Sequence, residues 1–137
     1  MPRVSGILET CLYVSDMEKS AQFYERIFGF QRMLSNERIC AFSVSDRDVL
    51  ILFLQGGTAQ PVQLPGGVLP PHDGSGQSHF AFAIAAEDLA SWEKHLAGNG
   101  VPIESRVHWE SGGDSIYFRD PDRHLAELAT PGIWPIY

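Results

Sequence analysis

The sequence predicts an α+β protein in which one β-α-β-β-β module occurs twice. Three observations carry this prediction: short apolar segments typical of strands, two segments with helical spacing, and the same element order in both halves. The chain has 137 residues, of which 44 % are hydrophobic, which suffices for a compact core without disulfides. We expect a single domain over residues 1–137, with modules at residues 7–54 and 79–130.

The first module begins with an expected strand at Ile7–Val14, followed by a helix whose first turn contains Ser15. Ser15 and Glu18 have the spacing of a capping box, in which each side chain satisfies a free backbone N–H group. Gly29 is suited to end the helix, because a residue without Cβ readily adopts the left-handed conformation. Three further strands are expected at Phe30–Ser35, Ile39–Val44 and Val49–Leu54.

The second module repeats this order, and aligning the two modules matches Glu9 with His79 and Leu52 with Glu127. It comprises an expected strand at His79–Ala85, a helix at Glu87–Ala97, and strands at Ile103–His108, Asp114–Arg119 and His124–Ala129. The intervening segment at residues 55–78 is rich in Gly and Pro and has no periodicity. A segment of this length is either a flexible linker or a functional lid.

Composition excludes several classes of function. The net charge is -7 and there is no basic run, which argues against a nucleic-acid partner. No apolar run approaches the ~20 residues of a membrane span, and the N-terminal residues do not resemble a secretory signal. We therefore expect a cytoplasmic protein in which Cys11 and Cys40 are reduced, although one disulfide is also conceivable.

Three polar residues interrupt apolar strands and are candidates for a metal site. Glu9, His79 and Glu127 occupy such positions, and a carboxylate on a buried sheet face is costly unless it is paired or binds a metal. If the repeat brings the three onto one concave wall, they form a site for a divalent ion. The alternatives are exposed or ion-paired carboxylates and a core or edge histidine.

Three stretches carry a family resemblance. They are LETCLYVSDMEKSAQFYERIFGF, SHFAFAI and SIYFRDPDRHLAEL, and together they cover both modules. They resemble the vicinal oxygen chelate superfamily, which includes glyoxalase I, fosfomycin- and bleomycin-resistance proteins and extradiol dioxygenases. The resemblance implies that the two βαβββ modules form a cupped, partly open mixed β-sheet barrel with a metal on its inner face. It also implies a homodimer.

The resemblance assigns ligands residue by residue. His79 matches the histidine ligand of the second module, Glu127 matches the closing glutamate, and Glu9 falls where many members place histidine. Glyoxalase-type members add a glutamate where this chain has Leu52, so the resemblance implies three protein ligands. Such a set suits Fe, Mn, Ni or Zn. Glu9 or Glu127 is also the expected catalytic base.

The favoured function is a metal-dependent enzyme of the lyase, isomerase or dioxygenase type, acting on a small molecule with vicinal oxygens. The rival function is metal-free binding of a drug, as in bleomycin-resistance members, with Trp134 among the residues that stack on the ligand. Each candidate substrate contact has a structural alternative: a solvated loop residue, a core aromatic or a turn-fixing ion pair. The candidates are His72, His108, Trp109, Tyr117 and Arg119.

Overall fold

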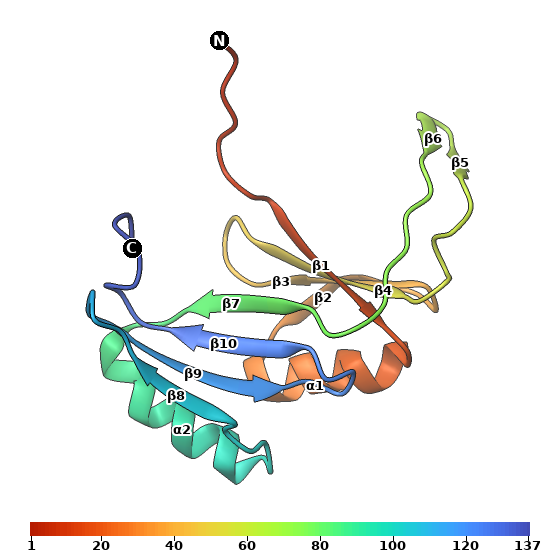
Figure 1. Ribbon diagram of the computed structural model, residues 1–137. Coiled ribbons are helices and arrows are strands. Elements are labelled where there is room, and N and C mark those ends of the chain that lie inside the picture. Colours follow the sequence, from red (N-terminus) through yellow and green to blue (C-terminus); the bar gives the residue numbers. More distant parts are fainter. The chain divides into compact units, whose positions relative to one another are not determined.

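The computed structural model describes residues 1–137 and divides the chain into two compact units, Met1–Gly76 and Gln77–Tyr137. Each unit contains one β-α-β-β-β module with a four-stranded mixed sheet (Figure 1). The sheets have the strand orders β1-β4-β3-β2 and β7-β10-β9-β8, and both are open. The predicted α+β class and the predicted repeat are therefore confirmed. Each unit is described below by itself.

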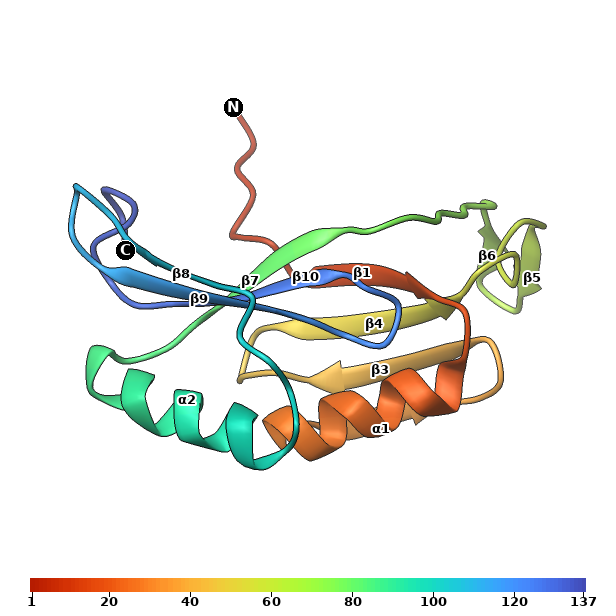
Figure 2. The same ribbon diagram turned by 60° about the horizontal axis from the view of Figure 1, so that its bottom comes forward.

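Unit 1 is built around one long helix. Its elements are β1 (Glu9–Val14), α1 (Met17–Phe28), β2 (Gln31–Ser35), β3 (Ile39–Ser43) and β4 (Val49–Leu54). β1 and β4 are parallel, and the other neighbours are antiparallel. α1 packs on β3 and β4, as Figure 2 shows, over the fully buried side chains of Leu12, Phe42 and Leu52. The residues that alternate with these face away from α1.

The ends of α1 follow the predicted chemistry with one correction. The cap residue is Asp16, not Ser15, and its carboxylate accepts a hydrogen bond from the Lys19 backbone N–H at 3.0 Å. A carboxylate at this position also interacts favourably with the helix dipole. Gly29 ends the helix in the left-handed conformation with φ of 69°, as predicted.

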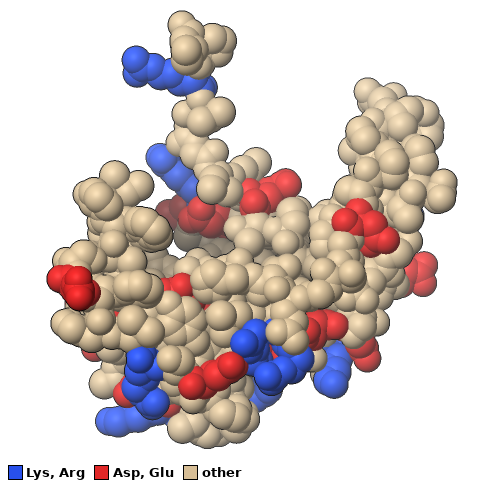
Figure 3. Space-filling view, viewed as in Figure 1, with Lys and Arg blue, Asp and Glu red and all other residues tan.

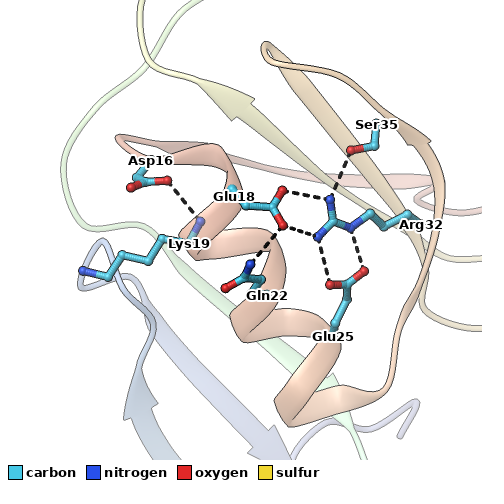
Figure 4. A network of polar contacts seen from close by, with 7 residues as sticks. All are labelled: Asp16, Glu18, Lys19, Gln22, Glu25, Arg32 and Ser35. Carbon is cyan, nitrogen blue, oxygen red and sulfur yellow. Dashed lines mark hydrogen bonds and ion pairs between the residues drawn. The ribbon is translucent and has the colours of Figure 1, made fainter.

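One arginine ties α1 to the edge strand β2. The Arg32 guanidinium donates to Glu25 through Nε at 2.6 Å and Nη2 at 2.9 Å, and it also donates to both Glu18 oxygens (Figure 4). These hydrogen bonds lower the pKa of the Glu18 carboxyl. The network fixes the helix against the exposed edge of the sheet.

The segment at residues 55–76 belongs to unit 1 and is more ordered than its sequence suggests. It contains a two-stranded hairpin of β5 (Val62–Leu64) and β6 (Gly67–Leu69). The Asp73 carboxylate accepts from the N–H groups of Gly56 and Gly74, so the two ends of the segment are joined. A Cβ at Gly74 would lie 2.5 Å from the Tyr13 ring, which shows how closely the backbone is packed on β1.

Unit 2 repeats the module with a shorter helix. Its elements are β7 (His79–Ala83), a 3-10 turn η1 (Ala86–Asp88), α2 (Leu89–Gly98), β8 (Ser105–His108), β9 (Asp114–Arg119) and β10 (Leu125–Ala129). The 3-10 turn replaces the first turn of the predicted helix. An ion pair of 2.6 Å between Arg106 and Glu93 joins β8 to α2.

The strand registers correct one predicted equivalence between the modules. Glu9 pairs with Val49 in unit 1, and His79 pairs with Leu125 in unit 2. Two residues further along, Glu127 therefore corresponds to Ile51 and not to Leu52, which is fully buried on the α1 side. A shift of one residue moves a side chain to the other face of a strand, so the predicted equivalence was wrong. Ile51 is also apolar, and a fourth carboxylate is still missing.

The remaining general predictions concern thiols, membranes and charge. Cys11 and Cys40 are both free thiols, as expected. No helix is long and apolar enough to cross a membrane. On the face drawn in Figure 3, basic side chains are interspersed with acidic ones.

Candidate metal centre

The centre is built on two neighbouring parallel strands of unit 2. His79 is the first residue of β7, and Glu127 lies in the middle of β10. The alternate residues Phe80, Ala126 and Leu128 are buried in the core, so His79 and Glu127 share the opposite face. His79 Nε2 lies 3.2 Å from Glu127 Oε2. The carboxylate side chain is only 10 % exposed, whereas the imidazole is half exposed.

The contact made by the second ring nitrogen of His79, Nδ1, indicates how Nε2 can interact with Glu127. His79 Nδ1 lies 2.9 Å from the backbone carbonyl oxygen of Leu125. A carbonyl oxygen only accepts, so Nδ1 carries a proton, and in a neutral ring Nε2 then presents a lone pair. Two lone-pair atoms 3.2 Å apart attract each other only through a positive centre, either a proton or a metal ion. A histidine whose Nδ1–H is held by a carbonyl is also the usual arrangement of a metal ligand.

The other oxygen of Glu127 is held by two hydroxyl groups. Glu127 Oε1 accepts from Ser115 Oγ at 2.5 Å and from the Tyr117 hydroxyl at 3.1 Å. Ser115 Oγ in turn accepts from the indole N–H of Trp109 at 2.9 Å. Burial raises the pKa of Tyr117, as does the Glu127 carboxylate, so the phenol remains a donor. The network fixes the carboxylate and leaves Oε2 for a cation.

Within unit 2 this pair has no third His, Cys, Asp or Glu beside it. The third predicted ligand, Glu9, belongs to unit 1, where it begins β1 with an exposed side chain. By strand alternation Glu9 shares the face of Cys11 and Tyr13, opposite α1. Its role as a ligand therefore stays a prediction.

A cavity of about 430 Å³ opens beside the His79 and Glu127 pair. Trp109 and Tyr117 line it together with that pair. The rest of the lining is apolar and consists of Ala81, Ala129, Ile133 and Trp134. The site thus combines one polar pair with a mostly aromatic and aliphatic wall, which is typical of small-molecule sites.

The family follows from a match over residues 6–128 to the Glyoxalase/Bleomycin resistance protein/Dioxygenase superfamily. The chain belongs to this superfamily. The expected membership in the vicinal oxygen chelate superfamily is thereby confirmed.

Relatives within the superfamily include resistance proteins. Metallothiol transferase FosB from Bacillus licheniformis is 32 % identical over 133 residues, covering 96 % of this chain and 79 % of that protein. Fosfomycin resistance protein FosX from Listeria monocytogenes is 27 % identical over 132 residues, covering 91 % and 89 % of the two chains. A lactoylglutathione lyase from Agrobacterium tumefaciens superposes with a TM-score of 0.88 at 26 % identity, covering 98 % and 99 %.

The predicted substrate contacts lie in several parts of the fold. Trp109 and Tyr117 line the cavity, and their role as substrate contacts stays a prediction. His108 pairs across the sheet with Asp114 and bonds its carboxylate through Nδ1 at 2.8 Å, on the face opposite Glu127. Arg119 is held by two hydrogen bonds to Glu104, at 2.7 and 3.1 Å. Arg119 also donates to a backbone carbonyl of the following turn, which matches the alternative role of fixing that turn.

His72 belongs to unit 1. Its Nδ1 is 2.6 Å from the Tyr13 hydroxyl, and its ring contacts Phe53 edge-on. His72 and Thr58 are joined through both a backbone and a side-chain hydrogen bond. In this structure His72 holds residues 55–76 against β1 and β4.

Sequence reasoning missed Ser115, the buried donor that links Trp109 to Glu127. The hairpin register contains the necessary information. Counting back from the turn at residues 120–123 places Ser115 and Tyr117 on the Glu127 face of β9.

Proposed function

We propose that this protein is a metal-dependent enzyme acting on a small molecule with two neighbouring oxygen atoms. The observation that carries the proposal is the orientation of His79, whose Nε2 lone pair faces Glu127 Oε2 at 3.2 Å. Two ligands roughly 2.1 Å from one cation are about 3 Å apart when they subtend a right angle. The spacing of the pair therefore fits a shared divalent ion.

The donor set indicates the class of metal. One imidazole nitrogen and carboxylate oxygens suit Fe, Mn, Ni or Zn, and the name of the FosB relative describes a metallothiol transferase. When bound, such an ion acts as a Lewis acid that stabilises negative charge on substrate oxygens. The name of the FosB relative favours a transferase over the expected lyase or isomerase.

The two glutamates differ in their suitability as a base. The Glu127 carboxylate is fixed by two hydroxyl donors, which favours a role as a permanent ligand. Glu9 has an exposed side chain, so it is freer to accept a proton from a substrate. We retain both as catalytic candidates and favour Glu9 for the base.

Metal binding provides the test. Protein purified without added metal is stripped with a chelator and titrated with Mn²⁺ and Zn²⁺ in a calorimeter. We expect about one ion per chain, and a loss of affinity of more than about 100-fold in Glu127→Gln, because an amide oxygen is a weaker ligand than a carboxylate. The glutamine can still accept from Ser115 and Tyr117, so this variant is expected to fold.

A matched control tests the second His and carboxylate pair of unit 2. Asp114→Asn alters the His108 pair, whose Nδ1 faces the carboxylate directly as in an ordinary hydrogen bond. Metal affinity should be unchanged in this variant. Equal metal binding by the wild type and Glu127→Gln would refute the proposed centre.

Metal-free drug binding is the second candidate function. The observation that favours it is the aromatic lining of the unit 2 cavity by Trp109, Tyr117 and Trp134. Elemental analysis separates the two candidates: near-stoichiometric divalent metal favours chemistry. Absence of metal after exposure to Fe, Mn, Ni and Zn salts favours sequestration.

A further inference from the structure

We propose that the C-terminal segment at residues 131–137 forms a wall of the unit 2 cavity that selects an uncharged, flat apolar substrate group, such as a phenyl ring. This inference rests on the proposed function and names its substrate class. Ile133 and Trp134 of this segment supply apolar side chains to the lining of the cavity. The superfamily match ends at residue 128, so this wall lies outside the matched region.

The segment is held in place by its own hydrogen bonds. The Tyr137 hydroxyl lies 2.7 Å from the Ala129 carbonyl oxygen and 3.1 Å from that of Ile84, at the ends of β10 and β7. The Tyr137 backbone N–H donates to Trp134 and its carbonyl accepts from Gly132, which closes the segment into a loop (Figure 1). Tyr137 is thus a positioning residue for Trp134.

Close packing fixes the start of the same loop. A Cβ at Gly113 would lie 2.7 Å from the Pro131 carbonyl oxygen, and one at Gly132 would lie 3.0 Å from the Gly112 backbone. All three glycines have positive φ, which is 102° for Gly112, 78° for Gly113 and 111° for Gly132. The loop therefore sits directly on the turn between β8 and β9.

Trp134 is well placed to contact a ligand. It lines the cavity and is 68 % exposed, so most of its ring is accessible to a ligand. The indole N–H of Trp109 is already used by Ser115, so the remainder of that ring offers apolar surface. Two indole rings beside a carboxylate and an imidazole suit a planar group joined to a chelating head.

Charge argues against a compact anion in this cavity. No Lys or Arg lines it, and Arg119, on the same sheet face, is engaged by Glu104. Arg106 lies on the opposite face with Glu93. A substrate anion beyond the metal would thus lack a cationic partner among the residues that line the cavity.

The face of the unit 1 sheet opposite α1 is equally free of basic residues. Along β1, β3 and β4 it carries Glu9, Cys11, Tyr13, Ile39, Ala41, Ser43, Val49, Ile51 and Phe53. This composition gives no site for a phosphonate such as fosfomycin.

A ligand pair isolates the selected group. Mandelate and lactate share vicinal carboxylate and hydroxyl oxygens and differ in a phenyl against a methyl group. With Mn²⁺-loaded protein, calorimetry should show mandelate binding about tenfold more tightly than lactate, the order expected for burying a phenyl ring against aromatic surface. Fosfomycin should bind no more tightly than lactate.

Variants of the wall assign the preference. Trp134→Ala should reduce the mandelate preference to about two- or threefold, with lactate affinity unchanged. Tyr137→Phe, which removes the hydroxyl anchor, should reduce it partly. Ile136→Ala is the control, since this residue of the same segment is 97 % exposed and does not line the cavity.

The outcomes distinguish this inference from the proposed function. Failure to take up Mn²⁺ refutes the proposed function, and the same ligand pair is then compared by tryptophan fluorescence on metal-free protein. Any of three results, with or without metal, overturns the proposed aromatic wall. These are equal affinities for mandelate and lactate, a mandelate preference that survives Trp134→Ala, and tighter binding of fosfomycin than of lactate.

Discussion

The two modules share their fold but not their polar chemistry. Both have the strand order first, fourth, third, second, with a parallel pair of the first and fourth strands at one edge and the helix inserted after the first strand. In unit 2 the helix-free face holds His79 and Glu127 with two hydroxyl donors. At the corresponding positions unit 1 has Glu9 and Ile51. The repeat therefore preserves packing, while the ligands depend on individual substitutions.

The buried cores offer the strongest test of this equivalence. Phe42 and Phe118 occupy matching positions, opposite Leu50 and Ala126 respectively, and both are fully buried. We expect Phe42→Ala and Phe118→Ala each to lower the free energy of unfolding by about 3–5 kcal/mol, because each leaves a cavity. Urea denaturation of the two variants measures this. A loss below about 1 kcal/mol for either would show that the two cores are not equivalent.

The hydroxyl network is the feature that unit 1 lacks. Ser115→Ala removes a donor to Glu127 and the acceptor of the Trp109 N–H group. We expect metal affinity to fall about tenfold, since a residue that orients a ligand contributes at this level. Calorimetric titration with Zn²⁺ checks it, and Ser111→Ala, on the neighbouring turn, serves as the control. Unchanged Zn²⁺ affinity in Ser115→Ala would show that the hydroxyl network does not contribute to metal binding.

The packing of residues 55–76 on β1 is a feature that unit 2 lacks. Gly74→Ala places a methyl group 2.5 Å from the Tyr13 ring, so the ring or the backbone must move. We expect a loss of about 1–3 kcal/mol in the free energy of unfolding, as for other overpacked sites. Gly66→Ala, where a Cβ meets nothing within 4 Å, is the matched control. Similar stability of the two variants would contradict the close packing.

The smallest expected effect concerns the ion pairs that join each helix to its edge strand. Arg32 binds two glutamates, whereas Arg106 binds only Glu93. Arg32→Ala should therefore lower the melting temperature more than Arg106→Ala, and both effects should shrink at high salt.

The ion pair of Glu18 with Arg32 also depends on pH. Because Arg32 lowers the pKa of Glu18, the contribution of this pair to stability is present above the pKa of the unfolded Glu18 carboxyl. It is lost as pH falls through the folded-state pKa. Equal losses of melting temperature in Arg32→Ala and Arg106→Ala, unchanged by salt, would contradict the expected difference between the two arginines.

Patterns of two and 3.6 residues were sufficient to predict the strands and helices of the two modules and the repeat itself. The same reasoning selected His79 and Glu127 as candidates, together with Glu9, because polar side chains in apolar strands are conspicuous. It assigned the helix cap to Ser15, since Ser15 and Asp16 are both good caps and local spacing does not separate them. It also missed the β5 and β6 hairpin, whose short strands are exposed and carry no alternation.

Other features depend on contacts between distant segments. The equivalence of Glu127 with Ile51 requires the pairing of β1 with β4 and of β7 with β10. The bond from Ser115 to Glu127 requires the register of β9 and β10. Neither register can be read from a single strand, since the side-chain period fixes the faces but not the pairing.

The protonation of His79 tests the central claim most directly. Nitrogen-15 NMR of the imidazole distinguishes the two neutral forms, and titration with diamagnetic Zn²⁺ follows the metal-binding nitrogen. The structure predicts a proton on Nδ1, held by the Leu125 carbonyl, and a Zn²⁺-dependent shift at Nε2. A neutral ring protonated at Nε2, or an Nε2 resonance that does not respond to Zn²⁺, would contradict it.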